Sequence, residues 1–481
     1  MTSGANETTD HPLLLAGSPT ETGEWAEVPS PYDGEPVGRV AIGDAALVEE
    51  AVQSAHAAFS AAALPQHERA AVLERAAELV AERTDELALT IALEAGKPIK
   101  TATVEAQRCA ETLRFSAVEA RKLSGAVVPM EASAAGAGKL GVLLRVPYGV
   151  VGAISPFNFP LNLVAHKLGP ALAAGNAVVL KPAHQTPISA LRLAAILSEA
   201  GLPEGWLSVI PGPGRTVGDA IVTHPLTEAI TFTGSAAVGW GIRAAVPAKK
   251  VSLELGSNAP LIVDRDGDWE TAADKAQLHA FSHAGQSCIS IQRILVHEQI
   301  AAPFTERLLA NVASLAVGDP LLPDTDVGPL ITPGDRDRVV GWIEEALAAG
   351  AKLLCGGEPL DEGRCLAPTV LAAPPKGAKV WCEEIFGPVA TLDTFADFEQ
   401  GLAMANDSKF GLQAGVYTRD VGRALQAART LRFGGVLVNE VPTFRADQQP
   451  YGGVKESGNT REGPAYAVTE LTEERFVTLQ G

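Results

Sequence analysis

The run Ala229-Ile230-Thr231-Phe232-Thr233-Gly234-Ser235-Ala236-Ala237-Val238-Gly239 indicates the fold of this chain. It reads as a short apolar strand, a glycine turn and the start of a helix. Four similar apolar runs alternate with helical segments between residues 149 and 262: Val150–Ile154, Ala177–Leu180, Leu207–Ile210 and Val251–Leu255. Such alternation predicts βαβ units and a parallel sheet. The alternation returns over residues 265–440, which predicts a second α/β lobe.

The regions before and after these runs have other patterns. Residues 1–45 are loop-rich with strand-like fragments. Three segments have the apolar spacing of amphipathic helices: Gln66–Arg83, Asp85–Ala95 and Ile99–Leu123. Leu140–Val146 is predicted to be a strand, and Leu471–Leu479 alternates like an edge strand.

Composition limits the class of protein. At roughly 150 residues per domain, 481 residues suggest about three lobes. A formal net charge of −19 argues against a nucleic acid partner. The cysteines form an odd, sparse set typical of reduced thiols in a cytoplasmic protein: Cys109, Cys288, Cys355, Cys365 and Cys382. None has metal-ligand spacing, so no metal is expected. Met1–Asp10 is polar and acidic, so we expect no signal peptide, and we see no membrane-spanning segment.

Three glycine-rich runs were compared with the dinucleotide-binding fingerprint. Gly136–Gly141 matches GxGxxG, but it precedes a predicted strand rather than a helix, so we interpret it as a linker. The runs ending at Gly214 and containing Gly234 both leave a strand and enter a helix. Such helix starts can hold a pyrophosphate, with Ser235 as an added donor. The alternative for each is an ordinary helix cap.

Four polar residues are candidates for chemistry, each with a simpler interpretation. Cys288, in Ala284-Gly285-Gln286-Ser287-Cys288-Ile289, could be a nucleophile if its pKa is shifted, or a core thiol. Glu254 could be a general base or a surface charge. Asn158, between Phe157 and Phe159, could donate to an oxyanion or form an Asx-turn. Lys181 ends a predicted strand, where ligands bind in open α/β sheets, but it could be a surface lysine.

In their order, these runs resemble the aldehyde dehydrogenase superfamily over about residues 20–480. The similarity rests on Pro156-Phe157-Asn158-Phe159-Pro160, Lys181-Pro182-Ala183, Phe232-Thr233-Gly234-Ser235, Leu253-Glu254-Leu255-Gly256, Gly285-Gln286-Ser287-Cys288, Glu383-Glu384-Ile385-Phe386-Gly387-Pro388 and Pro450-Tyr451-Gly452-Gly453-Val454-Lys455. The resemblance implies an α/β fold with a Rossmann-like NAD(P)-binding domain (1–125 and 148–262) and an α/β catalytic domain (263–460). It also implies a small β oligomerisation element (126–147 and 461–481). A homodimer or homotetramer is expected.

The resemblance also implies residue roles. Cys288 is the nucleophile that forms a thioester, Glu254 is the base for its hydrolysis, and Asn158 with the Cys288 N–H forms an oxyanion hole. NAD or NADP is the implied cofactor. Its expected binding residues are Ile154, Ser155, Pro156, Phe157, Lys181, Ala183, His184, Gly214, Gly234, Ser235, Leu255, Glu384 and Phe386.

Departures from the family pattern bear on cofactor and substrate. His184 stands where a glutamate is often found, which removes repulsion of a 2′-phosphate, so we expect NADP to be tolerated or preferred. The expected substrate-binding residues are Phe159, Leu163, His166, Ser282, Ser287, Ile289 and Arg445. His166, Ser282 and Arg445 replace common aromatics, and an arginine there suits a small anionic aldehyde such as a semialdehyde. The alternative is that Arg445 pairs with Asp447 or another acid and points away.

Two other functions were considered. A CoA-acylating relative passes the acyl group to a thiol instead of water, but such relatives often lack the carboxylate found here at Glu254. A catalytically silent structural protein on the same fold is the second, and retention of Cys288, Glu254 and Asn158 argues against it.

Overall fold

A seven-stranded, mostly parallel sheet organises the first half of the chain. The computed structural model describes residues 9–480. The strand order is β12-β11-β8-β9-β10-β2-β3, with β8 to β12 parallel and β2 and β3 antiparallel at one edge. The strands are β2 (Leu13–Leu15), β3 (Ser18–Thr20), β8 (Val150–Ile154), β9 (Ala177–Lys181), β10 (Leu207–Val209), β11 (Thr227–Thr233) and β12 (Lys250–Glu254).

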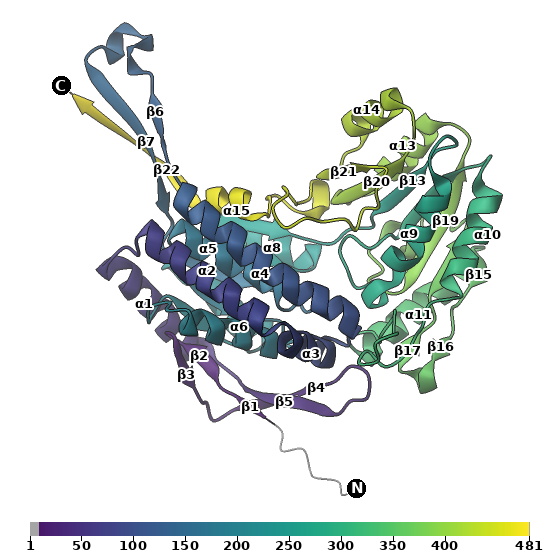
Figure 1. The fold of residues 1–481 in the computed structure, drawn as a ribbon, viewed down its shortest axis with the longest axis horizontal. Coiled ribbons are helices and arrows are strands. Elements are labelled where there is room, and N and C mark those ends of the chain that lie inside the picture. The colour runs from purple at the N-terminus through teal and green to yellow at the C-terminus, as the bar shows by residue number, and fades with distance from the viewer. Residues whose placement is uncertain (1–8, 481) are drawn as a thin grey trace, which may run out of the picture.

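Helices cover this sheet, and their apolar faces form the larger core with it (Figure 1). They are α1 (Ala45–Ala61), α2 (Gln66–Glu82), α3 (Thr84–Ala95), α4 (Ile99–Lys122), α5 (Asn162–Ala174), α6 (Pro187–Glu199), α7 (Asp219–Thr223) and α8 (Ala236–Ala245). Helix α5 is buried along its whole length. The strands and helices predicted between residues 66 and 255 are confirmed, with ends shifted by one or two residues.

A second seven-stranded sheet follows, as the repeated alternation predicts. Its order is β15-β18-β19-β14-β13-β20-β21, and only β15 pairs antiparallel. The strands are β13 (Pro260–Val263), β14 (Arg293–His297), β15 (Lys352–Cys355), β18 (Thr369–Ala372), β19 (Val389–Phe395), β20 (Gln413–Tyr417) and β21 (Gly435–Val438). The helices are α9 (Trp269–Phe281), α10 (Ala301–Val312), α11 (Pro333–Ala348), α12 (Lys379–Cys382), α13 (Phe398–Asn406) and α14 (Val421–Thr430).

A three-stranded antiparallel sheet forms an arm that projects from the body (Figure 1). Its order is β22-β7-β6, with β6 (Ala126–Val128), β7 (Lys139–Pro147) and β22 (Thr472–Gln480). Strand β22 lies at an edge, as its alternation predicts. The Gly136–Gly141 run leads from a 3₁₀ turn into β7 and is followed by no helix, so the linker interpretation is confirmed.

Two predicted domain boundaries differ from the elements. Strand β13 pairs with β14 and β20, so the chain passes between the two large sheets within residues 255–259, before residue 262. Helix α15 (Pro464–Glu470) packs against α4 and α5 because its buried face is apolar, so of residues 461–480 the arm takes only β22. The assignment of functions to the domains stays a prediction.

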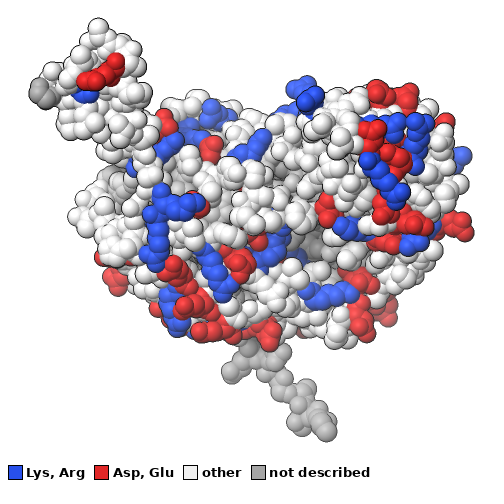
Figure 2. Space-filling model, turned by 45° about the horizontal axis from the view of Figure 1, so that its top comes forward, with Lys and Arg blue, Asp and Glu red and all other residues white. Residues whose placement is uncertain are grey.

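Smaller sheets complete the architecture. Strands β1 (Asp10–His11), β5 (Pro36–Ala41) and β4 (Trp25–Pro29) form one, and β16 (Pro359–Leu360) with β17 (Cys365–Leu366) forms another. In the described residues no helix is long and apolar enough to cross a membrane. The expectation of no signal peptide in Met1–Asp10 concerns mainly residues 1–8, which lie outside the described residues. Figure 2 shows acidic and basic side chains intermixed over one face of the molecule.

Candidate active site

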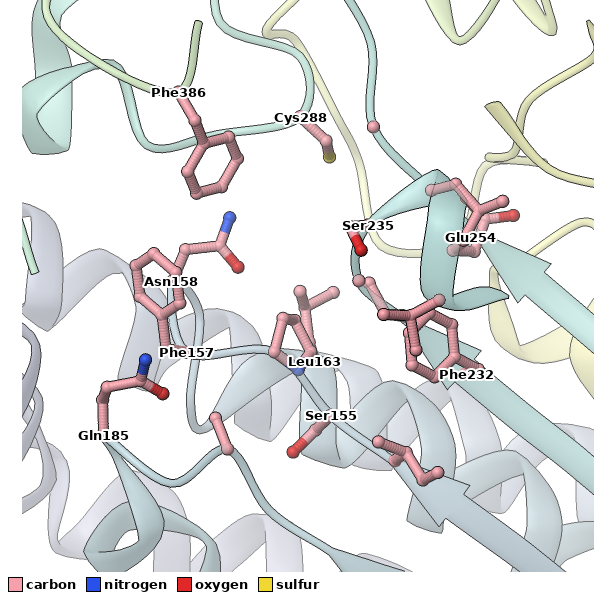
Figure 3. A pocket seen from close by; sticks show the side chains of 18 of the residues that line it. Ser155, Phe157, Asn158, Leu163, Gln185, Phe232, Ser235, Glu254, Cys288 and Phe386 are labelled. Carbon is pink, nitrogen blue, oxygen red and sulfur yellow. The ribbon is translucent and has the colours of Figure 1, made fainter. Parts of the chain in front are cut away.

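One cavity of about 610 Å³ lies where four strands of the first sheet end. Strands β12, β11, β8 and β9 are consecutive and parallel in the sheet, so their carboxyl ends lie at the same edge. Segments of the second lobe close the cavity from the other side (Figure 3). The lining residues are Ile154, Ser155, Pro156, Phe157, Asn158, Leu163, Lys181, Ala183, His184, Gln185, Phe232, Thr233, Gly234, Ser235, Val238, Glu254, Leu255, Gly256, Cys288, Asp335, Arg338, Glu384 and Phe386.

Most of the predicted site residues meet in this cavity. All three candidates for catalysis line it, as do all the candidates for cofactor binding except Gly214. Gly214 is exposed at the start of a helical turn, Gly214–Gly218, whose last residue lies against the Lys181 side chain. Of the predicted substrate residues only Leu163 lines the cavity; those outside the lining are Phe159, His166, Ser282, Ser287, Ile289 and Arg445.

The Cys288 side chain points into the cavity and is partly buried (Figure 3). Its Sγ lies 2.8 Å from the hydroxyl oxygen of Tyr451. Burial raises the pKa of the Cys288 thiol to about 12, whereas the Tyr451 hydrogen bond and the Arg445 charge act in the opposite direction. The thiol is therefore protonated at neutral pH in the ligand-free site.

Asn158 is fixed against the segment that carries the thiol. Its Nδ2 donates to the backbone carbonyl of Gln286 at 2.8 Å, which leaves the second amide hydrogen free. Gln286 is itself held, because its Oε1 accepts from the Ile331 N–H. Within residues 9–480 the Cys288 N–H donates no hydrogen bond. Two donors thus lie close to the thiol without competing partners.

Glu254 ends β12 and is buried. Neither carboxyl oxygen has a hydrogen-bond partner among the described residues. A Cβ on Gly452 would lie 2.7 Å from Oε1, so a glycine is needed there to leave room for the carboxyl group. Burial and the nearby Glu462 raise the pKa of Glu254 well above its usual value. A carboxyl group in this state becomes a strong base once it loses its proton.

Three buried residues beside the cavity were missed by the sequence analysis. Lys167 Nζ donates to Thr233 Oγ1 at 2.7 Å and lies 3.8 Å from Glu462 Oε1. Tyr451 contacts the thiol. A signal for Lys167 was available, because a lysine inside the apolar stretch Leu163–Ala174 is rarely a surface residue. Glu462 and Tyr451 had no comparable signal.

Three further polar residues line the cavity: Lys181, Ser235 and Glu384. Lys181 is buried, and among residues 9–480 its Nζ donates only to the carbonyl of the next residue, Pro182. Burial lowers the pKa of Lys181 to about 8. Ser235 precedes α8, and its side chain caps no backbone N–H. Glu384 lies over Gly256, where a Cβ would clash with the carboxyl group, and accepts from the Ser257 N–H at 2.9 Å. Burial raises the pKa of Glu384 to about 7.

Two aromatic rings narrow the middle of the cavity. Phe386 packs edge-on against Phe157, with ring centroids 5.7 Å apart. Phe386 has φ of +49°, which is uncommon for a bulky residue and is held by the surrounding structure.

The predicted cationic substrate residue is paired. Arg445 Nη2 donates to Glu462 Oε2 at 2.9 Å, and only 7% of the arginine side chain is exposed. Asp447 pairs instead with Arg108 and contacts His166, which is buried. The alternative that Arg445 pairs with an acid is therefore observed, with Glu462 as the partner. Its guanidinium nevertheless lies over the Tyr451 ring, 3.8 Å from the centroid, so a single ring separates it from the thiol.

Comparisons with known proteins agree with this geometry. Residues 18–477 match the aldehyde dehydrogenase family. The chain belongs to the aldehyde dehydrogenase family. It is 43% identical to the 3-sulfolactaldehyde dehydrogenase of Priestia aryabhattai, over 97% of each chain.

Solved structures of other aldehyde dehydrogenases superpose closely. Aldehyde dehydrogenase 21 from Physcomitrella patens, in complex with the reaction product succinate, has a TM-score of 0.95 and 37% identity over 98% of each chain. An NADP-dependent enzyme of E. coli also has a TM-score of 0.95, with 36% identity over 98% of each chain. This dehydrogenase therefore oxidises aldehydes to acids and uses NAD or NADP.

Proposed function

We propose that this dehydrogenase oxidises a small anionic aldehyde through a covalent adduct on Cys288. The observation that carries the proposal is the meeting of Cys288, Asn158 and Glu254 in one cavity. The Cys288 thiol loses its proton to solvent, and the sulfur then forms a bond to the aldehyde carbon while the carbonyl π pair moves to the oxygen. The negative charge that develops on oxygen is stabilised by the free Asn158 amide hydrogen and the Cys288 N–H, because preorganised donors need no reorientation.

Glu254 serves the second half of the reaction. Once the adduct has become a thioester, the Glu254 carboxylate takes a proton from water, which then attacks the thioester carbon and releases the acid and the thiol. The buried carboxyl group has no hydrogen-bond partner in the part of the chain that the structure describes, so it is free to bind that water. In this scheme water activated by Glu254, and not CoA, takes the acyl group from Cys288. We therefore expect that added CoA does not accelerate turnover.

The end of the cavity near β9 and α8 is proposed to bind NAD(P). Two observations support this. The N-terminus of α8 has backbone donors that the Ser235 side chain leaves free, and such a helix start suits a pyrophosphate. Lys181 and Glu384 supply partners for ribose hydroxyls. When bound, the dinucleotide supplies the electron acceptor for oxidation of the Cys288 adduct.

A preference for NADP, or tolerance of it, is proposed from His184. The side chain is exposed at the rim of the cavity next to Lys181 and Ala183. A carboxylate at this position would repel a 2′-phosphate, and a histidine does not. One structural relative is an NADP-dependent enzyme, which supports this proposal.

An anionic substrate is proposed from cationic side chains of the site region and from the substrates or products of the relatives. Arg445 lies one ring from Cys288, and Arg108 is partly exposed on α4. Of the relatives named above, one is a 3-sulfolactaldehyde dehydrogenase and another was solved with its reaction product succinate, a dicarboxylate. Glu462 is shared by Arg445 and Lys167, so this buried cluster has two cationic side chains and one carboxylate, and the attraction comes from its net positive field and not from a free guanidinium.

The test is a panel of aldehydes followed by NAD(P)H absorbance with each cofactor. Succinic semialdehyde is compared with butanal in the wild type and in Arg445→Gln, with thermal unfolding as a check on folding. We expect a higher kcat/KM for the semialdehyde and a smaller ratio in the variant. If butanal is the better substrate and the variant leaves the ratio unchanged, the anionic-substrate proposal fails, while any oxidation still supports the reaction class.

Assembly and cellular location are proposed from the exposed arm and from the cysteines. The three-stranded arm exposes the apolar side chains of Val127, Leu140, Phe476 and Leu479. Exposed apolar side chains on a projecting sheet favour contact with another copy of the chain. We therefore propose a homodimer or homotetramer. The unpaired cysteines support a reducing, cytoplasmic compartment.

A further inference from the structure

The contact between Tyr451 and Cys288 has no role in the scheme above. The Tyr451 hydroxyl lies 2.8 Å from the sulfur, and the tyrosine is 3% exposed. Its ring forms a small apolar cluster with Ile289 and Leu412, and Cys288 packs against this cluster. A buried tyrosine hydroxyl normally has a hydrogen-bond partner, and here that partner is the proposed nucleophile.

The position of the ring is fixed from two directions. The Arg445 guanidinium covers one face, 3.8 Å from the centroid, and Glu462 holds the guanidinium. The backbones of Tyr451 and Glu462 exchange two hydrogen bonds, of 3.1 Å and 2.5 Å. Moving the hydroxyl away from the sulfur would therefore disturb an ion pair and a backbone bridge together.

Either atom can donate while the thiol keeps its proton, and the direction of the hydrogen bond becomes fixed when the sulfur is ionised. A thiolate can only accept, so the hydroxyl must donate to it. Among the charged groups that face Cys288, Glu254 and Glu384 disfavour the thiolate, whereas Arg445 favours it. Arg445 also favours negative charge on the ring that it covers, which makes the hydroxyl a better donor. A hydrogen bond to a charged group is about twice as strong as one between neutral groups.

We propose that Tyr451 is a positioning residue whose hydroxyl donates a hydrogen bond to the Cys288 thiolate, which orients the sulfur and increases its reactive fraction. The inference rests on the proposed role of Cys288 as nucleophile. It adds a group that holds the nucleophile before any aldehyde arrives. Because the contact exists in the free enzyme, its effect can be measured without substrate.

The test is the alkylation rate of Cys288 by iodoacetamide from about pH 6 to about pH 10, followed by mass spectrometry of the Cys288 peptide. Tyr451→Phe removes only the hydroxyl. We expect alkylation at about pH 7.5 to slow by about tenfold and the rising limb of the pH profile to move to higher pH, as loss of a charge-assisted hydrogen bond predicts. In aldehyde turnover, kcat falls and KM stays within about twofold.

A matched control is Tyr417→Phe. Tyr417 is a buried tyrosine at the end of β20 whose hydroxyl has no partner among the described residues, so its removal should leave the alkylation profile unchanged. An unchanged or faster alkylation in Tyr451→Phe overturns the inference, since a hydroxyl that only packs, or that accepts from the thiol, would give those results. The alkylation result is independent of aldehyde oxidation, so failure of the proposed function is seen separately in the aldehyde panel.

Discussion

At the scale of single residues, the proposed chemistry depends on side chains that have been left without other partners. Glu254 has two unpaired carboxyl oxygens, and the Cys288 N–H donates to no acceptor within residues 9–480. Unsatisfied buried polar groups are costly, so they mark places where a ligand or water completes the hydrogen bonding.

Cys288→Ala should lower aldehyde oxidation by at least about 10³-fold, because no other residue supplies the sulfur. Glu254→Gln should keep an initial burst of NAD(P)H but slow steady turnover by about 10²-fold to 10⁴-fold, because only thioester hydrolysis needs the base. Rapid-mixing absorbance measures both phases. Full steady-state activity in either variant would contradict the role given to that residue.

His184→Glu should shift cofactor preference toward NAD. The side chain is exposed, so repulsion between the new carboxylate and a 2′-phosphate is screened, and kcat/KM for NADP should fall by about fivefold. The value for NAD should change by less than about twofold. His184→Gln is the uncharged control. A wild-type enzyme with a strong preference for NAD would already reject the interpretation of His184.

At the scale of elements, α5 carries the active-site loop, and a buried ion pair fixes its first turn. Glu105 of α4 accepts from the N–H groups of Leu161 and Asn162 and forms an ion pair with Lys97, and both charged side chains are about 1% exposed. The loop that contains Asn158 runs from the end of β8 into α5 through this point, so the oxyanion donor is positioned from a helix far from it in the sequence.

Glu105→Ala should destabilise the fold by about 3–5 kcal/mol, because it leaves Lys97 buried and unpaired and removes the cap of α5. The midpoint of urea unfolding gives the change. Glu111→Ala is the control on the same helix, since its pair with Arg114 is about half exposed and its loss should matter little. Equal midpoints for the two variants would show that the buried pair does not hold the helix.

A substitution on the arm allows the proposed assembly to be tested. Val127 on β6 is 72% exposed, and a charge at an apolar contact between copies should disrupt it. Val127→Lys should reduce the mass measured by light scattering, whereas Val421→Lys, on an equally exposed valine of α14, should not. A wild-type chain that is already monomeric would reject the homo-oligomer proposal.

At the scale of the whole molecule, a charge network joins the two lobes next to the active site. Arg108 of α4 forms two hydrogen bonds with Asp447, which follows the second sheet, and His166 of α5 also contacts Asp447. His166 and Arg108 hold the pKa of Asp447 well below its usual range, against the opposing effect of burial. Folding therefore favours the ionised carboxylate.

Asp447→Asn should reduce stability at pH 7 by about 1–3 kcal/mol. Because the folded-state pKa is depressed, the contribution of Asp447 is complete above its unfolded pKa of about 3.9 and is lost as the pH falls through the folded value. The unfolding midpoints of wild type and variant should therefore converge below about pH 4. Asp274→Asn, which removes an exposed pair with Arg307, is the control and should change the midpoint little at either pH. A difference that grows in acid would contradict the sign.

The sequence by itself determined the local elements and the identity of the reactive groups. Short apolar runs such as Val150–Ile154, set between turn residues and helical segments, can be recognised as strands from neighbouring residues alone. The glycine turns follow from backbone freedom at single positions. The catalytic candidates Cys288, Glu254 and Asn158 could be named because each lies in a recognisable run. The exact passage between the sheets could not, because β13 is assigned by its pairing partners β14 and β20.

Only the tertiary structure decided which polar groups became partners. Arg445 was expected to face the substrate, but Glu462 holds it, and Tyr451 reaches Cys288 across 163 residues of sequence. Residues so far apart meet only after the two sheets and the segment from Arg445 to Glu462 have packed together. The protonation and pairing of buried charges depend on that packing, since burial and the nearest opposite charge set them, and neither is encoded in local spacing.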